Sequence, residues 1–382
     1  MREHFLLDPN LIFLNHGSFG ACPREVFDAQ QRWQLEMEKN PVAFLGRRSA
    51  ELLRAARERL GETIGADADD LVFTANATTG VNTIAQSLTL HPGDEVLTTD
   101  LEYGACDATW WRVCERSGST YRRVEIPLPY RRDEFVARVM EGVADRTRVI
   151  FVSHITSTTA LILPVASLCA AARARGILTL IDGAHAPGQI ALDVDAIGAD
   201  FYVGNCHKWL CAPKGSAFLH AGAEHHALLD ALVTSWGYAA GTGGHAGFDA
   251  YLGTTPLERR MQWQGTRDIA SWLSVPAAID FQVRHDWSAV RTRSHALARR
   301  AHDTLTQRHG LAPVAQDDDW AQMAVIPVPV QDADALRRRL YDESRIEVPV
   351  TTHAGRVFVR VSVQGYNTDD DIDALLAAPA LA

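Results

Sequence analysis

Short apolar runs alternate with stretches of helical spacing over residues 22–220. The runs are rich in Val, Ile and Leu without polar alternation, so a strand formed by any of them would be buried on both faces. This pattern predicts a large α/β domain with a mainly parallel sheet covered by helices. The predicted strands are 70–74, 95–98, 148–152, 177–181 and 201–203.

The order of elements changes after about residue 270. Long helical stretches come first, and a mixture of strands and one further helix follows them. This order is typical of a small α+β domain with a partly antiparallel sheet. The predicted elements are a strand at 323–328, a helix at 332–343, and strands at 346–350 and 356–361.

The amino-acid composition indicates which kinds of molecule the protein can bind. The 382 residues are 47% hydrophobic and 22% charged, enough for a large core, and the formal net charge is −10. This acidic balance argues against a nucleic-acid or anionic-membrane surface and favours small-molecule ligands. The amino terminus lacks the uninterrupted apolar stretch of a signal peptide, and no run has the length of a membrane span. We therefore expect a cytoplasmic protein.

The six cysteines are scattered along the chain, which favours reduced thiols over a disulfide framework. Cys206 and Cys211 flank His207, and these are residue types that bind metal ions. No second Cys/His pair at suitable spacing accompanies them, and we predict no metal site.

A lysine and an aspartate follow two of the predicted strands. Asp182 comes directly after the strand 177–181, and Lys208 lies shortly after the strand 201–203. Parallel strands place their carboxyl ends at one edge of a sheet, so both side chains could reach one crevice. Pyridoxal phosphate (PLP) forms a Schiff base with a lysine and pairs its ring nitrogen with a carboxylate. The pair therefore predicts a PLP site, although a surface lysine and a helix-capping aspartate would be the plainer alternatives.

An anion site is predicted at the helix that follows the first strand. Asn76, Ala77 and Thr78 precede an apolar helical stretch, and a helix amino terminus binds phosphate groups. The same residues could serve only as a helix cap. His207 could contact the phosphate or cap a turn, and His185 lies near both Asp182 and Lys208 in the sequence.

Taken together, several motifs resemble the class V aminotransferase family of fold-type I PLP enzymes. Within it the resemblance is to isopenicillin N epimerases and to the C–S lyases of ergothioneine pathways. It implies a large domain with a mainly parallel seven-stranded sheet and a small C-terminal α+β domain. The matching segments are 14–18, 76–78, 102–103, 153–157, 182–185, 204–209, 264–268 and 360–367.

The resemblance also implies three parts and a homodimer with shared active sites. Residues 1–20 would contribute to the substrate site, residues 21–268 would form the PLP-binding domain, and residues 269–382 would form the small domain. The implied roles are phosphate binding by Ala77 and Thr78, ring stacking by Tyr103, contact with the ring hydroxyl by Ser157, pairing with the ring nitrogen by Asp182, the Schiff base on Lys208, contact with the neighbouring subunit's phosphate by Thr266, and binding of the substrate carboxylate by Arg360.

We expect the substrate pocket to be lined by Asn15, His16 and Gly17 and by the glycine-rich stretch 237–253. That stretch could be a mobile flap, a subunit contact or a solvated loop. Loops of this kind vary freely on a shared scaffold, so the amino-acid substrate itself is not predicted.

The sequence leaves the reaction open. Once Lys208 has removed the substrate α-proton, the outcome could be epimerisation, loss of a β-substituent or transamination. Tyr103, His16 or His185 could provide the second acid/base. No cysteine follows Cys211, which argues against a desulfurase that carries a persulfide, and His353 is a further loop candidate. A non-enzymatic PLP-binding regulator or a scaffold that has lost the cofactor are the competing interpretations.

Overall fold

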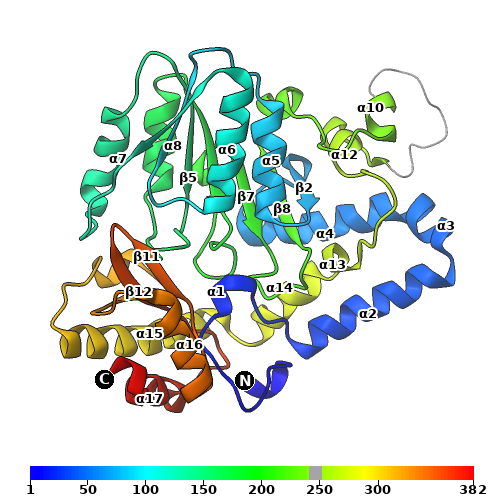
Figure 1. Cartoon of the computed structure of the whole chain (residues 1–382). Helices are drawn as coiled ribbons and strands as arrows, with labels where there is room; N and C mark the ends of the chain where they lie inside the picture. Colours follow the sequence, from blue (N-terminus) through cyan, green and yellow to red (C-terminus); the bar gives the residue numbers. More distant parts are fainter. Residues whose placement is uncertain (241–251) are drawn as a thin grey trace.

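Seven strands form one sheet in the larger part of the molecule, as Figure 1 shows. The computed structural model describes residues 1–240 and 252–382. The order across the sheet is β2-β8-β7-β6-β5-β3-β4, and β8 runs antiparallel to both of its neighbours while the other pairs are parallel. The strands are β2 Leu71–Thr74, β3 Glu95–Thr99, β4 Thr120–Val124, β5 Thr147–Ser153, β6 Leu178–Gly183, β7 Phe201–Asn205 and β8 Ala217–Ala221.

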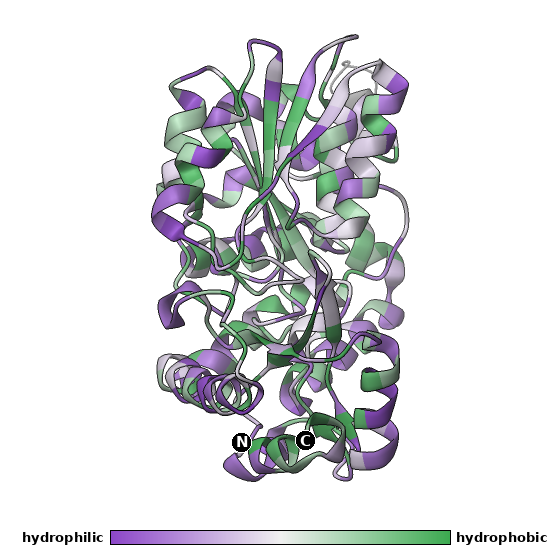
Figure 2. Ribbon diagram, turned by 60° about the vertical axis from the view of Figure 1, so that its left-hand side comes forward, coloured by the Kyte–Doolittle hydropathy of each residue, from purple (hydrophilic) through white to green (hydrophobic). Residues whose placement is uncertain are grey.

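Both faces of this sheet are covered. Ile150 and Val152 of β5 belong to one apolar cluster, whereas Val149 and Phe151 belong to a second, as the two-residue period of a strand requires. Figure 2 shows the hydrophobic colour concentrated in the central strands. The prediction of a buried, mainly parallel sheet is therefore confirmed. The larger helices of this part are α2 Arg24–Lys39, α4 Ser49–Ile64, α5 Ala77–Ser87, α6 Gly104–Ser117, α7 Arg132–Glu141, α8 Val165–Arg173 and α12 Pro256–Met261.

The C-terminal part contains an antiparallel sheet of order β11-β12-β9. A second, two-stranded sheet joins β1 near the amino terminus to β10 in parallel, so the first residues of the chain dock onto this part. The elements are β1 Ile12–Phe13, α1 His16–Phe19, α13 Ala270–Leu273, α14 Val275–Arg284, α15 Trp287–His309, β9 Met323–Val328, α16 Ala333–Ser344, β10 Ile346–Glu347, β11 Val350–His353, β12 Arg356–Ser362 and α17 Asp369–Ala377.

The structure corrects three details of the expected pattern. The strand expected at 346–350 is divided, because β10 and β11 belong to different sheets and Pro349 between them has no N–H to donate. Strands β4 and β8 were not predicted. β4 is an edge strand with no buried residue, so the buried apolar run that marks a central strand is missing.

Two further expectations concern the chain as a whole. Residues 241–251 of the glycine-rich stretch lie outside the described residues, and the division at residues 20 and 268 stays a prediction. Among the helices that the structure describes, none is long and apolar enough to cross a membrane.

Candidate active site

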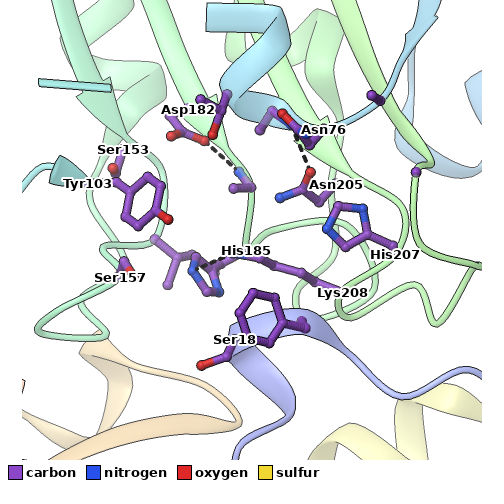
Figure 3. Close-up of a pocket in the computed structure, with 17 residues that line it drawn as sticks. Ser18, Asn76, Tyr103, Ser153, Ser157, Asp182, His185, Asn205, His207 and Lys208 are labelled. Atoms are coloured by element: carbon purple, nitrogen blue, oxygen red, sulfur yellow. Dashed lines mark hydrogen bonds between the residues drawn. The ribbon is translucent and has the colours of Figure 1, made fainter. Parts of the chain in front are cut away.

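A cavity of about 330 Å³ lies at the carboxyl ends of the central strands (Figure 3). It forms there because neighbouring parallel strands end at this edge and the turns that follow them diverge. Most of the predicted cofactor residues meet in its wall. These are Asn76, Ala77, Thr78, Tyr103, Ser157, Asp182, His185, His207 and Lys208.

Lys208 follows β7 and is buried in this wall. Its Nζ lies 3.1 Å from Nε2 of His185. Burial lowers the pKa of the amine from 10.5 to about 8, because desolvation penalises the charged form; the nearby Asp182 carboxylate opposes this shift and Arg360 adds to it. A lowered pKa makes the amine available as a nucleophile and as a base near neutral pH.

Asp182 ends β6 and is only 4% exposed. Its Oδ1 accepts a hydrogen bond from the N–H of Ala184 at 2.9 Å, and its Oδ2 accepts one from Sγ of Cys106 at 3.5 Å. Burial raises the pKa of the carboxyl, while the Ala184 hydrogen bond and the charge of Lys208 lower it. A cation brought against this buried acid would favour its charged form.

The amino terminus of α5 provides the expected anion site in part. Asn76 caps the helix by accepting from the N–H of Thr79 at 2.8 Å, and the N–H of Ala77 donates to Oδ1 of Asn205 at 2.9 Å. Within the described residues, neither the N–H nor the hydroxyl of Thr78 donates to another protein group. Thr78 is therefore the residue of this turn whose donors are available for a phosphate.

His207 lies in the same wall and is fixed from behind. Its Nδ1 donates to the carbonyl of Ser216 at 3.0 Å, because a carbonyl can only accept. Burial lowers the pKa of the ring to about 4. The ring thus lies beside the anion site as a neutral group.

Arg360, on β12 of the C-terminal part, contacts two residues of the cavity wall, Ser157 and Ser18. Its Nη1 donates to the carbonyl of Ser157 at 2.6 Å and contacts Oγ of Ser157 at 3.3 Å, and its Nη2 donates to Oγ of Ser18 at 3.0 Å. Its buried Nε has no partner among the described residues. The guanidinium is 4% exposed, and burial lowers its pKa to about 10. A buried cation with an unpaired donor is suited to bind a carboxylate.

The amino-terminal residues take a different position from the one expected. Ser18 and Phe19 line the cavity, whereas Asn15, His16 and Gly17 do not. His16 is fully buried: its Nδ1 accepts from the N–H of Ala21 at 3.3 Å, and its Nε2 lies 3.0 Å from the carbonyl of Lys208. Burial lowers its pKa to about 3. The ring thus anchors the main chain of Lys208, and its predicted role in substrate binding gains no support from this geometry.

Thr266 lies in a separate surface hollow, with Val42, Trp236 and Trp263, and does not line the cavity that holds Lys208. Thr266 therefore does not contribute to the cavity of its own chain. Its expected reach to a neighbouring subunit stays a prediction.

The sequence reasoning missed several polar residues of the site. Glu102 is buried, with one oxygen 2.7 Å from both the N–H and Oγ of Ser153, and burial raises its pKa to about 8. Ser153 and Asn205 end β5 and β7 and line the cavity. Their positions as polar residues at the carboxyl ends of strands were the available signal for Ser153 and Asn205.

These groups fit the requirements of PLP. One cavity is lined by a buried amine with a lowered pKa, a buried acid without a cationic hydrogen-bond partner and unpaired donors at a helix amino terminus. A buried cation, Arg360, contacts two residues of its wall. A PLP site needs the same set of groups.

Comparisons with known proteins agree with this assignment. The class V aminotransferase family model matches residues 12–375. Isopenicillin N epimerase from Streptomyces clavuligerus is 40% identical over 99% of this chain and 96% of its own length. L-cysteine desulfhydrase from Arabidopsis thaliana is 28% identical over 95% of this chain and 86% of its own.

Solved structures agree on the fold. A C-DES mutant with glycine linked to its PLP cofactor superposes with a TM-score of 0.84 over 100% of this chain and 99% of its own, at 23% identity. With the family model spanning nearly the whole sequence and the cavity fitting the cofactor, the chain belongs to the class V aminotransferase family of PLP-dependent enzymes.

Proposed function

We propose that this enzyme removes the α-proton of an amino-acid substrate, with Lys208 as the base, and returns a proton to the opposite face, so that the α-carbon is epimerised. The observation that carries the proposal is that Lys208 and Asp182 line one cavity, while Arg360 contacts Ser18 and Ser157 of the same cavity wall. PLP, when bound, supplies an aldehyde that links to amines and a ring that accepts the electron pair left by the departing proton.

The protein groups divide the remaining work. Arg360 binds the substrate α-carboxylate, exchanging its present contacts with Ser18 and Ser157 for two parallel hydrogen bonds. Asp182 would pair with the ring nitrogen of PLP and favour its protonated form, since the buried carboxylate has only uncharged donors as hydrogen-bond partners. Lys208, with its pKa lowered to about 8, accepts the proton.

Epimerisation needs a second proton carrier, and Tyr103 is the best placed of the three candidates. It lines the cavity, is 48% exposed and lies close enough to Arg360 to oppose, in part, the lowering of the Arg360 pKa by burial. His185 contacts the amine of Lys208, which is the first proton carrier, and so it is not a separate second carrier. His16 is buried outside the cavity wall.

The relatives support this branch over the others. Two proteins named isopenicillin N epimerase are 40% and 38% identical over 99% of the chain, whereas a putative L-cysteine desulfhydrase of Oryza sativa is 30% identical over 95% of it. The second candidate is C–S bond cleavage, which shares the first step and is favoured by the latter relative. Transamination is the third.

The branches are separated by incubating the enzyme in deuterated water with isopenicillin N, a panel of L- and D-amino acids, and cysteine. We expect α-deuterium and inversion without loss of amine, and no exchange with Lys208→Ala. Formation of pyruvate and sulfide from cysteine would show that the enzyme cleaves the C–S bond instead. Formation of the 2-oxo acid that corresponds to the substrate would show that it is a transaminase. A wild-type enzyme with PLP bound that catalyses none of these reactions would overturn the proposal.

We also propose that the enzyme is a homodimer. The hollow around Thr266 includes Val42 and Trp236, which are 64% and 45% exposed. Exposed apolar side chains at a hollow mark association sites. Sedimentation analysis should give twice the chain mass of 41.9 kDa, and a monomer with full activity would refute the shared site.

A further inference from the structure

We propose that Trp209 is a positioning residue that fixes the tautomer of His185 and thereby directs an imidazole N–H at the amine of Lys208. The proposal concerns the site assigned above and rests on the proposed role of Lys208. It follows from the donor and acceptor properties of three side chains that form a chain of contacts in space: the indole of Trp209, the imidazole of His185 and the amine of Lys208.

The indole decides the first contact. Nε1 of Trp209 lies 3.2 Å from Nδ1 of His185. An indole N–H can only donate, so Nδ1 of His185 must accept and cannot carry a hydrogen. His185 is fully buried beside Lys208 and Arg360, and burial together with these charges lowers its pKa well below 6.5. The ring is therefore neutral, and its single proton is on Nε2.

The second contact follows from the first. Nε2 of His185 lies 3.1 Å from Nζ of Lys208. With a hydrogen on Nε2, this nitrogen donates, and the amine must accept through its lone pair. An ammonium group has no lone pair and would place hydrogen against hydrogen. The arrangement therefore favours the neutral amine, which is the form that attacks an aldehyde or accepts a proton.

The opposite tautomer would have the opposite effect. If the proton were on Nδ1, then Nε2 would offer a lone pair to Lys208 and would stabilise the ammonium form. The N–H of Trp209 excludes this tautomer, because a proton on Nδ1 would face the indole hydrogen. Replacing the indole by a ring without an N–H should thus raise the pKa of the lysine.

The surroundings hold Trp209 in the required place. Its side chain is fully buried, its carbonyl accepts from Nε2 of Gln282 at 2.8 Å, and its ring lies 5.0 Å from that of His16. His16 in turn lies 3.0 Å from the carbonyl of Lys208. Hydrogen bonds therefore hold the carbonyls of both Lys208 and Trp209, and burial restricts the movement of the indole.

The test is the pH dependence of acylation of Lys208 in the full-length chain freed of PLP. The chain has only three lysines, Lys39, Lys208 and Lys214, so peptide mass spectrometry resolves each one, and the exposed Lys39 serves as the internal reference. Trp209→Phe should move the Lys208 midpoint upward by roughly 1 pH unit, as expected when a hydrogen bond to the neutral form is lost. The matched control is Trp287→Phe, which removes another buried indole, on α15, and should leave the midpoint unchanged.

A purely structural role for Trp209 would lower stability and leave the midpoint in place, which would overturn the proposal. If Trp209→Phe does not fold, ¹⁵N NMR of histidine-labelled wild type gives the answer, with the His185 signal assigned by its loss in His185→Gln. A proton on Nε2 supports the proposal, and a proton on Nδ1 overturns it. A wild-type Lys208 that titrates near 10.5 would instead contradict the proposed function.

Discussion

The amine of Lys208 should lose its proton near pH 8 in the chain freed of cofactor. Its environment lowers the pKa from 10.5 to about 8. At pH 7.5 an amine with a pKa of 8 is about one quarter neutral, whereas one with a pKa of 10.5 is about one thousandth neutral. Acylation of Lys208 at this pH should therefore be faster by roughly 200-fold than the unshifted value would allow, once access to the cavity is factored out.

Two substitutions should move this midpoint in opposite directions. Asp182 stabilises the ammonium form and Arg360 destabilises it. Asp182→Asn should therefore lower the midpoint and Arg360→Met should raise it, with the exposed Lys39 as reference in every sample. The midpoint is independent of how easily the reagent enters the cavity. A wild-type midpoint near 10.5, or a shift of both variants in the same direction, would refute this account of the site.

Three further predictions concern Arg360, Gly20 and Glu102. Arg360→Lys should raise KM for the amino acid by roughly 10- to 100-fold with a smaller effect on kcat, because a point charge replaces a two-pronged donor. Gly20→Ala should lower the free energy of unfolding in urea by more than about 1 kcal/mol, since Gly20 has a φ of +69° and an added Cβ would meet the carbonyl of His207. Glu102 has a folded pKa of about 8 against 4.5, so the unfolded chain loses this proton first and stability falls between pH 4.5 and 8; Glu102→Gln should remove that fall in urea titrations at several pH values.

The sequence predicted those features that short segments encode. Buried apolar runs located five of the seven strands in the large sheet, and the residues after β6 and β7 located Asp182 and Lys208. β8 was missed although all five of its residues are buried. Strand direction depends on the connection and not on the run itself, so the antiparallel course of β8 had no local signal.

Contacts between distant segments had no comparable signal. Ser18 meets Arg360 only because β1 pairs with β10 and carries the amino terminus onto the C-terminal part. His16 was expected at the substrate as part of the amino-terminal segment of Asn15, His16 and Gly17. In the single turn of α1 the two side chains take different directions, and His16 packs inward against Trp209 while Ser18 reaches the cavity. Proximity in sequence therefore located the segment but not which of its residues faces the substrate.

The arrangement of proton carriers bears on the reaction itself. Lys208, His185 and Trp209 form one connected set of hydrogen bonds, whereas within the described residues no hydrogen bond joins Tyr103 to any of them. Tyr103 comes from the connection between β3 and α6, and Lys208 comes from the turn after β7. If both carriers shared one network, a proton taken from one face could return to that face, and inversion would be inefficient. Two separate carriers permit inversion. Tyr103→Phe should therefore preserve α-proton exchange with one enantiomer while abolishing interconversion of the two, and equal loss of both activities would show that Tyr103 only supports the ring.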